Sequence, residues 1–360
     1  SPDLSPLQLH YNCHVYLLLS CLSLHNIPYL LVVFSHIHIH IHIHQFSQSP
    51  TTTKMSPPSA TNTNAETVNT GAAVPITPHS EASTTTHEPG LSKEQAKARP
   101  GNLRFPFRTP FEDKYAEREY QKGRLALAFR IFAKLGYDEG VAGHITLRDP
   151  VDPTSFWVNP FGVAWPLLRA SDLILVNKDG EVIEGGPCRL LNTAAYMIHH
   201  AVHTARPEIN AVAHSHSLYG RAFCTLGRPL DTITQDACAF HNDLALYSSF
   251  RGIVLASEEG HAIASALGSK KAALLQNHGL LTCGESIESA VFWFTSLEKC
   301  CHAQLLADAA AGGRGGETIK IEEEDAAYTS KAIGTEKVGY FSAKPAFDMM
   351  EHESGTDYKW

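Results

Sequence analysis

The chain lacks an excess of positive charge. It holds 29 Lys and Arg against 37 Asp and Glu, a formal net charge of −8 at pH 7 over 360 residues, and it contains no basic cluster. A protein whose main partner is nucleic acid carries a basic patch that neutralises phosphates. The composition therefore argues against a nucleic-acid partner.

A disulfide framework is also absent. Cys300 and Cys301 are adjacent inside a helical pattern, and the other cysteines are scattered through apolar surroundings without the spacing of a zinc finger. We therefore expect reduced, mostly buried thiols in a cytoplasmic protein.

The sequence has no Gly-x-Gly-x-x-Gly phosphate loop, which is the usual signature of a dinucleotide site, and no regular alternation of strands and helices. Strands and helices are instead mixed. This mixture predicts one α/β domain at residues 111–315, a three-layer α/β/α arrangement with a mixed sheet between two helical layers.

Residues 1–54 differ from the rest of the chain. The first methionine is Met55, and an apolar run from Val15 to Phe34 contains a His, an Asn and a Pro, with no preceding positive charge as in a signal peptide. From His36 to His44, His and Ile alternate strictly, as a translated short nucleotide repeat would. Our hypothesis is that residues 1–54 are translated upstream sequence. The alternative is a membrane anchor at residues 15–34.

Two further segments flank the predicted domain. Residues 55–110 are rich in Ser, Thr, Pro, Ala and Asn with few large apolar side chains, which predicts a disordered leader. Residues 316–360 form a charged C-terminal tail, whose aromatics we expect to dock on a neighbour: Tyr340, Phe341 and Phe347.

Apolar residues recur with a helical period in some segments and form short runs between turns in others. We predict helices at Tyr115–Leu135, Asn192–Thr204, Leu218–Leu226, Glu259–Leu267 and Ser286–Ala309. We predict strands at Gly143–Arg148, Ser155–Asn159, Leu173–Asn177, Val182–Ile183, Ala211–His216, Ile253–Leu255 and Ala272–Gln276. Residues Thr232–His241 are predicted to be a strand or a polar loop.

Two apolar runs lead into histidines. The segment Ile209–Ser217 contains His214 and His216, which share one face if the segment is a strand. The second run, Leu274–Leu280, carries His278 before a glycine, where a strand would turn. Three neutral imidazole nitrogens leave a fourth position on an ion open, which is typical of a catalytic zinc site.

The His-x-His spacing alone is weak evidence, because it recurs in His36–His44, to which we assign no metal role. The apolar strand before His214 and the third histidine in a second apolar strand favour a metal site. Zinc is the expected ion and manganese the alternative, although three imidazoles also accept iron or cobalt.

Seven ordered segments resemble the class II aldolase/adducin family over about residues 115–310. The resemblance implies a three-layer fold with a mostly antiparallel central sheet, a small-molecule substrate, and assembly into a homotetramer or similar oligomer with active sites at subunit boundaries. The segments are Gly143–Arg148, Asn159–Gly162, Ala170–Leu173, Asn192–Tyr196, Arg206–Pro207, His214–His216 and Gln276–Gly279.

The sugar-phosphate aldolases of this family bind zinc through the residues that match His214, His216 and His278. Their catalytic Glu falls at Ala195, and no carboxylate occurs from residue 187 to residue 204. The phosphate-binding segments have changed as well: His144 replaces an Asn, and Phe161-Gly162 and Thr193-Ala194 replace other polar pairs. The resemblance assigns substrate binding to His144, Asn159, Phe161, Gly162 and Asn192.

Four residues are candidates for the missing base or acid: Tyr247, Asp236, Glu259 and His241. Tyr247 lies in Leu246–Phe250, which resembles the aldolase segment whose Tyr reaches a neighbouring active site. Each candidate has a structural alternative, since Asp236 suits a turn and Glu259 suits the first turn of a helix.

The loss of a positioned base lowers the rate by roughly 10²–10⁴-fold. We therefore expect a metal-dependent C–C lyase, by aldol cleavage or decarboxylation, that acts on a small oxygenated carbonyl compound or acid rather than a phosphosugar. Decarboxylation needs only later protonation once the charge on the substrate is stabilised. The alternative is a non-catalytic, adducin-like interaction module with a residual metal site.

Overall fold

The computed structural model describes residues 110–250, 252 and 257–360. The predictions for residues 1–54, including the anchor at 15–34, for the leader up to residue 109 and for a strand at Ile253–Leu255 lie outside the described residues. In the part that is described, no helix combines the length and apolar character needed to cross a membrane. The cysteines described there are free, and all but Cys188 are buried.

Eight strands of the described residues form one sheet in the order β4-β3-β2-β1-β5-β8-β7-β6. Neighbouring strands are antiparallel except β6 and β7, which are parallel, so the predicted mixed, mostly antiparallel sheet is confirmed. The strands are β1 His144–Arg148, β2 Phe156–Val158, β3 Ile174–Val176, β4 Val182–Gly185, β5 Ala211–Ser215, β6 Leu244–Tyr247, β7 Ala272–Leu275 and β8 Gly279–Gly284.

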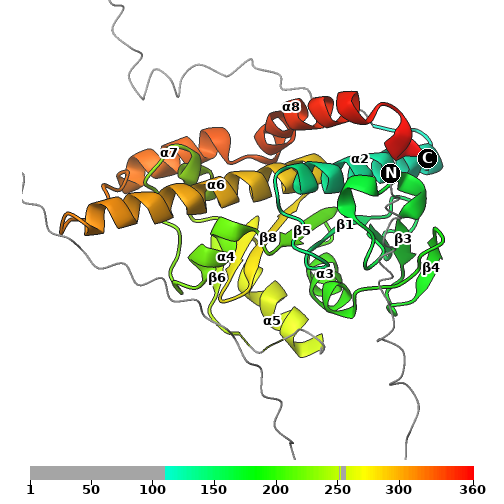
Figure 1. Ribbon diagram of the computed structural model, residues 1–360, viewed down its shortest axis with the longest axis horizontal. Coiled ribbons are helices and arrows are strands. Elements are labelled where there is room, and N and C mark those ends of the chain that lie inside the picture. Colours follow the sequence, from blue (N-terminus) through cyan, green and yellow to red (C-terminus); the bar gives the residue numbers. More distant parts are fainter. Residues whose placement is uncertain (1–109, 251, 253–256) are drawn as a thin grey trace, which may run out of the picture. The chain divides into compact units, whose positions relative to one another are not determined.

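Helices cover the two faces of this sheet (Figure 1). The α-helices are α2 Lys114–Lys134, α3 Thr193–Ala205, α4 Leu218–Cys224, α5 Ser257–Leu267, α6 Ile287–Gly312, α7 Glu323–Ile333 and α8 Glu336–Ser354. Short 3₁₀ turns are η1 Trp165–Leu167, η2 Ala170–Asp172, η3 Asp236–Phe240 and η4 Asp357–Lys359.

In the central strands β5, β7 and β8, successive side chains join separate hydrophobic clusters on the two faces of the sheet. In β5, Ala211 and Ala213 join the cluster beneath α2 and α6, whereas Val212 joins the cluster beneath α3 and α5. In β8, Leu280 and Leu281 divide in the same way. The predicted three-layer α/β/α arrangement is therefore confirmed, and it assigns every strand residue to one of two faces.

Both ends of helix α2 are marked by capping residues in the sequence. The carboxylate of Asp113 accepts a hydrogen bond from the backbone N–H of Tyr115 and caps the start. Gly136 follows the end with a φ of 75°, a conformation that glycine adopts without steric penalty. The helix predicted at Tyr115–Leu135 is confirmed.

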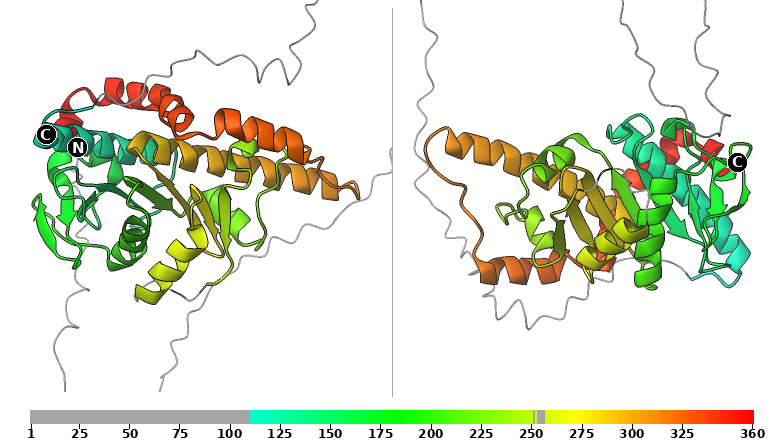
Figure 2. Two further views of the ribbon diagram at one scale, coloured as in Figure 1. Left: turned by 180° about the vertical axis from the view of Figure 1, so that it is seen from behind. Right: turned by 90° about the horizontal axis from the view of Figure 1, so that it is seen from below.

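The C-terminal segment belongs to the core of this domain. Figure 2 shows α7 and α8 running along the side of the sheet that carries α6. Phe347 of α8 is 0% exposed and joins the same cluster as Phe129 and Phe294. The expectation that the aromatics of residues 316–360 dock on a neighbour is wrong for Phe347, because a large apolar ring is stabilised by burial in its own chain.

Strands β6 and β8 and helices α7 and α8 were not predicted from the sequence. Residues 236–240, within the segment predicted to be a strand or a polar loop, form the turn η3. Strand β8 begins at Gly279 and ends at Gly284, and glycine within a short segment lowers its β-propensity. Pairing with β5 and β7 on both sides makes it a buried central strand nonetheless.

Candidate metal centre

Strand pairing brings the three predicted ligands together. His214 lies near the end of β5 and His216 directly follows that strand. Strand β5 pairs with β8, so that Ser215 faces Leu280, and His278 lies in the tight turn that joins β7 to β8. The side-chain atoms of the three histidines that could bind an ion all lie within 4.8 Å of one another.

The three rings surround a common point. Ring centroids are 4.7 Å apart for His214 and His278, 4.9 Å for His216 and His278, and 5.2 Å for His214 and His216, with interplanar angles of 67°, 75° and 79°. His214 is 1% exposed, whereas the other two are half-buried. An ion held here would be covered on the side of His214 and approachable on the other side.

The tautomer of His214 follows from the hydrogen bond of its Nδ1 nitrogen. Its Nδ1–H donates to the carbonyl oxygen of Leu280 at 2.8 Å, and a carbonyl can only accept. The Nε2 nitrogen of His214 is therefore the one that carries a free lone pair. Such a hydrogen bond on the second nitrogen fixes ring orientation in metal-binding histidines.

Gly279 makes the close approach of the two strands possible. A Cβ atom at this position would lie 2.6 Å from the carbonyl oxygen of Ser215, and 3.5 Å from ring atoms of His214 and His216. The preceding turn also contains Asn277 with a φ of 57°, a region that Asn tolerates. The glycine after His278 is therefore part of how the site is built.

Burial keeps these histidines neutral. Desolvation lowers the pKa of His278 to about 4, with a smaller contribution from His216. It also lowers the pKa of His214 and of His216, in each case as the largest cause. Metal ligation requires the unprotonated ring, so the three rings are in the required form at neutral pH and the donor set fits one divalent ion.

Two of the predicted catalytic residues form a buried pair with each other. The hydroxyl of Tyr247 donates to Oε1 of Glu259 at 2.7 Å, and each residue is 8% exposed. Tyr247 ends β6 and pairs with Leu275, which ends β7 three residues before His278. The pair thus lies on the α3–α5 face, and at the same end of the strands as the histidine group.

The other two predicted catalytic residues lie elsewhere in this chain. Asp236 and His241 belong to η3 and its end, whose apolar neighbours Ala237 and Phe240 join the cluster on the α6 face. The Nε2 atom of His241 lies 3.1 Å from a carboxylate oxygen of Glu323 in α7. Within one chain, the structure does not bring them to the three histidines.

The residues predicted to bind substrate have separate settings. Asn192 caps α3 by accepting from the N–H of Ala194 at 3.1 Å, and Phe161 donates its backbone N–H to Leu190 O at 2.7 Å. Gly162 has a φ of 87° in the loop after β2. Asn159 is 8% exposed, and its Oδ1 has no hydrogen-bond partner among the described residues.

Among the predicted substrate-binding residues, His144 lies beside the histidine group. It opens β1 opposite His214, and the two ring centroids are 5.0 Å apart. Its ring is also 4.3 Å from that of His199 in α3. Neither ring nitrogen of His144 has a hydrogen-bond partner among the described residues.

His199 and His203 of α3 are two site residues that the sequence analysis did not identify. The structure shows them bonded to one hydroxyl: Thr146 Oγ1 lies 2.7 Å from Nδ1 of His199 and 2.8 Å from Nε2 of His203. Their spacing of four residues places both on the helix face that covers β1. That spacing was the available signal, but it does not reveal which strand lies opposite.

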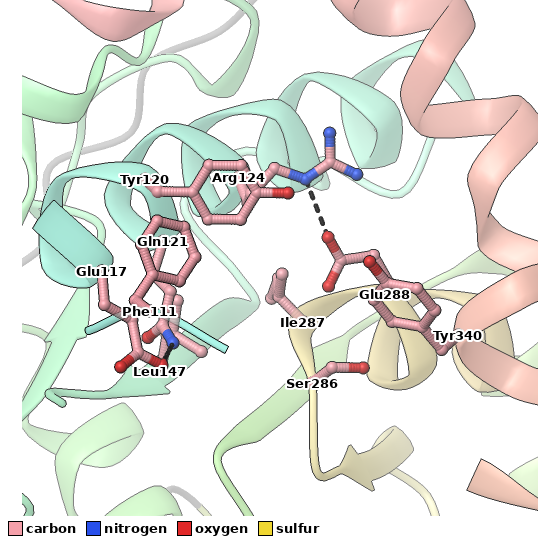
Figure 3. A pocket seen from close by; sticks show the side chains of 10 residues that line it. All are labelled: Phe111, Glu117, Tyr120, Gln121, Arg124, Leu147, Ser286, Ile287, Glu288 and Tyr340. Atoms are coloured by element: carbon pink, nitrogen blue, oxygen red, sulfur yellow. Dashed lines mark hydrogen bonds and ion pairs between the residues drawn. The ribbon is translucent and has the colours of Figure 1, made fainter. Parts of the chain in front are cut away.

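A separate cleft of about 210 Å³ lies on the other face of the sheet (Figure 3). It is enclosed by α2, the start of α6 and α8, and an ion pair of 2.8 Å between Arg124 and Glu288 crosses it. None of the predicted site residues lines it. Its lining consists of Phe111, Glu117, Tyr120, Gln121, Arg124, Leu147, Ser286, Ile287, Glu288 and Tyr340.

Comparison with known proteins gives consistent matches. The decarboxylase NovR of Streptomyces niveus is 45% identical over 239 residues, which cover 66% of this chain and 86% of that protein. The 4-hydroxy-3-prenylphenylpyruvate oxygenase/4-hydroxy-3-prenylbenzoate synthase of Streptomyces roseochromogenus is 44% identical over 66% of this chain and 84% of that protein.

The solved structure of an L-fuculose 1-phosphate aldolase from Glaciozyma antarctica is 52% identical, has a TM-score of 0.65, and covers 70% of this chain and 96% of that one. The family model of the class II aldolase and adducin N-terminal domain matches residues 123–305, a span that includes the three histidines, their strands, helices α3 to α5 and most of α6. This chain belongs to the class II aldolase and adducin family.

Proposed function

We propose that the protein is a metal-dependent C–C lyase that acts on a small oxygenated acid or carbonyl compound, with decarboxylation as the leading reaction and aldol cleavage as the second. The observation that carries the proposal is the convergence of His214, His216 and His278 on one point. A divalent ion held there supplies Lewis-acid stabilisation of the negative charge that develops on a substrate oxygen when the C–C bond breaks.

The names of the relatives support C–C cleavage of two kinds. A protein 45% identical to this chain is named a decarboxylase, and one 52% identical is named an L-fuculose 1-phosphate aldolase. Both reactions leave an electron pair on the carbon that loses its partner, and both need that charge delocalised onto oxygen. The reactions differ in whether a base must first remove a hydroxyl proton.

The sequence of α3 favours decarboxylation. Position 195, where the aldolases carry their catalytic Glu, is alanine, and residues 187–204 contain no carboxylate. Release of carbon dioxide needs no such base, only a later proton donor at the carbon. We assign that protonation to the hydrogen-bonded pair of Tyr247 and Glu259. The pair lies on the same face of the sheet and at the same end of the strands as the three histidines.

We further propose zinc as the ion, with manganese as the alternative, and a homotetramer as the assembly. Three imidazoles fit either ion. In a tetramer with sites at subunit boundaries, Asp236 and His241 would serve a neighbouring site rather than their own. Asn159, Phe161, Gly162 and Asn192 are assigned to the substrate side of the centre on the family resemblance alone.

Metal analysis of the full chain purified without chelator tests the proposal. We expect about one divalent ion per chain for the wild type and below about 0.1 for His216→Ala, with unchanged circular dichroism. The matched control is His261→Ala, which removes an exposed histidine from α5 and leaves the metal content as in the wild type.

The reaction class is tested with the same samples. We expect the loaded wild type to release carbon dioxide from β-keto or ortho-hydroxy acids, and His216→Ala to lose this activity. Faster cleavage of L-fuculose 1-phosphate than of any acid tested would place the protein with the phosphosugar aldolases. A metal-free wild type, or one that unfolds when the ion is removed, would favour the non-catalytic interaction module.

A further inference from the structure

A line of polar side chains leads from the surface of the domain to the three-histidine group. It starts at Arg148, which ends β1, and passes through His203, Thr146 and His199. Nη2 of Arg148 lies 3.3 Å from Nδ1 of His203, and the hydroxyl of Thr146 lies between His203 and His199 at 2.8 and 2.7 Å. Apart from Arg148, these side chains are at most 4% exposed.

Nη2 of Arg148 also donates to the carbonyl oxygens of His203 and Ile209 at 2.7 and 3.0 Å. Where it donates to Nδ1 of His203, that nitrogen accepts and Nε2 carries the hydrogen, because a guanidinium can only donate. That Nε2–H donates to Thr146, whose single hydroxyl hydrogen is then directed to Nδ1 of His199. His199 is thereby left with its hydrogen on Nε2.

The next ring in the line is His144. Its centroid is 4.3 Å from that of His199 and 5.0 Å from that of His214. His199 Nε2 and both nitrogens of His144 are buried without a hydrogen-bond partner among the described residues. A buried polar atom without a partner costs about 1–3 kcal/mol, so three such atoms beside one another indicate a position that a ligand completes.

We propose that His144 donates a hydrogen bond to an oxygen atom of the ligand bound at the three-histidine centre. Arg148, His203, Thr146 and His199 are positioning residues that hold His144 in the tautomer able to donate. A small rotation of the His144 ring, whose terminal torsion has a broad energy well, lets one nitrogen accept from His199. The other nitrogen then carries the hydrogen towards the centre.

The outer ring of the line, His203, is neutral. Burial lowers its pKa to about 3, with Arg148 opposing protonation as well. In a site that excludes water, the hydrogen bond from a neutral donor strengthens as negative charge develops on the acceptor oxygen. The donor is already in place, so no side chain has to reorganise.

The inference rests on the proposed function, because the ligand binds at the proposed metal site. Its first test needs neither metal nor ligand. Two-bond ¹H–¹⁵N correlation spectra of the metal-free full chain, labelled at histidine, report each tautomer directly. We expect the Nε2–H form for His203 and His199. Thr146→Val should release His199 from a single tautomer, and Thr146→Ser should restore it. The reversed line, with His203 Nδ1–H on the carbonyl of Ile209, would overturn the proposal.

The second test measures the hydrogen bond to the ligand. The probe is oxalate, added to the Co²⁺-loaded full chain and followed by the visible spectrum of the ion. We expect Thr146→Val and His144→Phe each to weaken oxalate binding by about three- to tenfold, the loss of one hydrogen bond. Co²⁺ affinity should stay within about threefold, because His214 donates its Nδ1–H to the carbonyl oxygen of Leu280 and not to a member of this line.

The matched control is Thr282→Val. Its hydroxyl is buried in the same sheet and donates to the carbonyl of Ala290 at 2.9 Å, on the α6 face. It should lower stability and leave oxalate binding unchanged. Equal oxalate affinity in wild type, Thr146→Val and His144→Phe would overturn the inference alone, whereas absence of Co²⁺ binding to the wild type would overturn the proposed metal site and this ligand with it.

Discussion

The Nδ1 nitrogen of His214 lies 2.8 Å from the carbonyl oxygen of Leu280, on the strand that pairs with its own. One hydrogen bond thus joins a metal-ligand candidate to the strand that follows His278. Because β5 and β8 are held in register by their backbone hydrogen bonds, the ring of His214 and the turn that carries His278 move as one unit. The centre is therefore a property of strand register more than of any loop.

The first prediction concerns the close contact of these strands. Gly279→Ala would place a Cβ atom 2.6 Å from Ser215 O and against the rings of His214 and His216. Because backbone must move to relieve the contact, we expect about 1–3 kcal/mol of lost stability and weaker metal binding. Urea unfolding and metal titration measure the two effects.

The matched control for that change is Gly312→Ala at the end of α6, where a Cβ atom meets nothing within 4 Å. Alanine is the better helix former, so this variant should be as stable as the wild type or slightly more so. Tight metal binding by a fully stable Gly279→Ala protein would contradict the role assigned to strand register.

The second prediction concerns the pair formed by Tyr247 and Glu259. Tyr247→Phe removes the hydroxyl that donates a hydrogen bond of 2.7 Å to Oε1 of Glu259, so that this oxygen loses one donor. We expect about 1–3 kcal/mol of lost stability from this buried position, and a fall of roughly 10²–10⁴-fold in turnover if the pair moves the proton.

Equilibrium unfolding and steady-state kinetics separate these two effects for the pair. Glu259→Gln should lower turnover by a similar factor while the amide still accepts from Tyr247. The control is Tyr115→Phe, since that tyrosine is 64% exposed on α2 and should change neither quantity. Unaltered turnover in both Tyr247→Phe and Glu259→Gln would remove the pair from the mechanism.

The third prediction is a loss of stability in acid. Burial lowers the pKa of His203 to about 3, below the ordinary value of 6.5. Between these two pH values the unfolded chain therefore binds a proton at His203 that the folded chain does not bind. Its contribution is present in full above pH 6.5 and is lost progressively as the pH falls from 6.5 towards 3. Between pH 7.5 and 5.5 one such histidine removes about 1.4 kcal/mol.

Guanidinium unfolding of the metal-free chain at several pH values between 7.5 and 4.5 measures this slope. His203→Gln should flatten it by the share of one proton, whereas His261→Gln, an exposed position on α5, should leave it unchanged. A free energy of unfolding independent of pH across that range would show that His203 protonates freely in the folded state.

The fourth prediction concerns the C-terminal segment. Phe347→Ala removes a ring that is 0% exposed and lies beneath the guanidinium of Arg124, 4.2 Å from the ring centroid. A buried Phe→Ala change costs about 3–5 kcal/mol. Phe341→Ala on the same helix, at 38% exposed, should cost less than about 1 kcal/mol. Equal effects in urea unfolding would show that α8 is not part of the core.

Much of the fold was readable from the sequence because its signals are local. Asp113 and Gly136 mark the ends of α2 by capping chemistry that needs no distant partner. His214 and His216 fall on one face through the two-residue period of a strand. The order of motifs around them was enough to identify the family.

Other features depended on segments far apart in the chain. Strand β8 carries glycine at both ends and is stabilised by partners on each side, and Phe347 is buried only because α8 lies along α6. Asp236 and His241 likewise belong to a turn that packs on the α6 face, away from the three histidines of the same chain. Their sequence does not reveal on which face of the sheet they lie.

By itself, the sequence determined which residues have the chemistry to bind an ion: three histidines at the ends of apolar runs. The tertiary structure decided what surrounds them. It paired His144 with His214 and placed His199 and Thr146 in contact, although 53 residues separate the latter two along the chain. The physical reason is that backbone pairing and burial act between strands and helices whose separation in sequence carries no information about their distance in space.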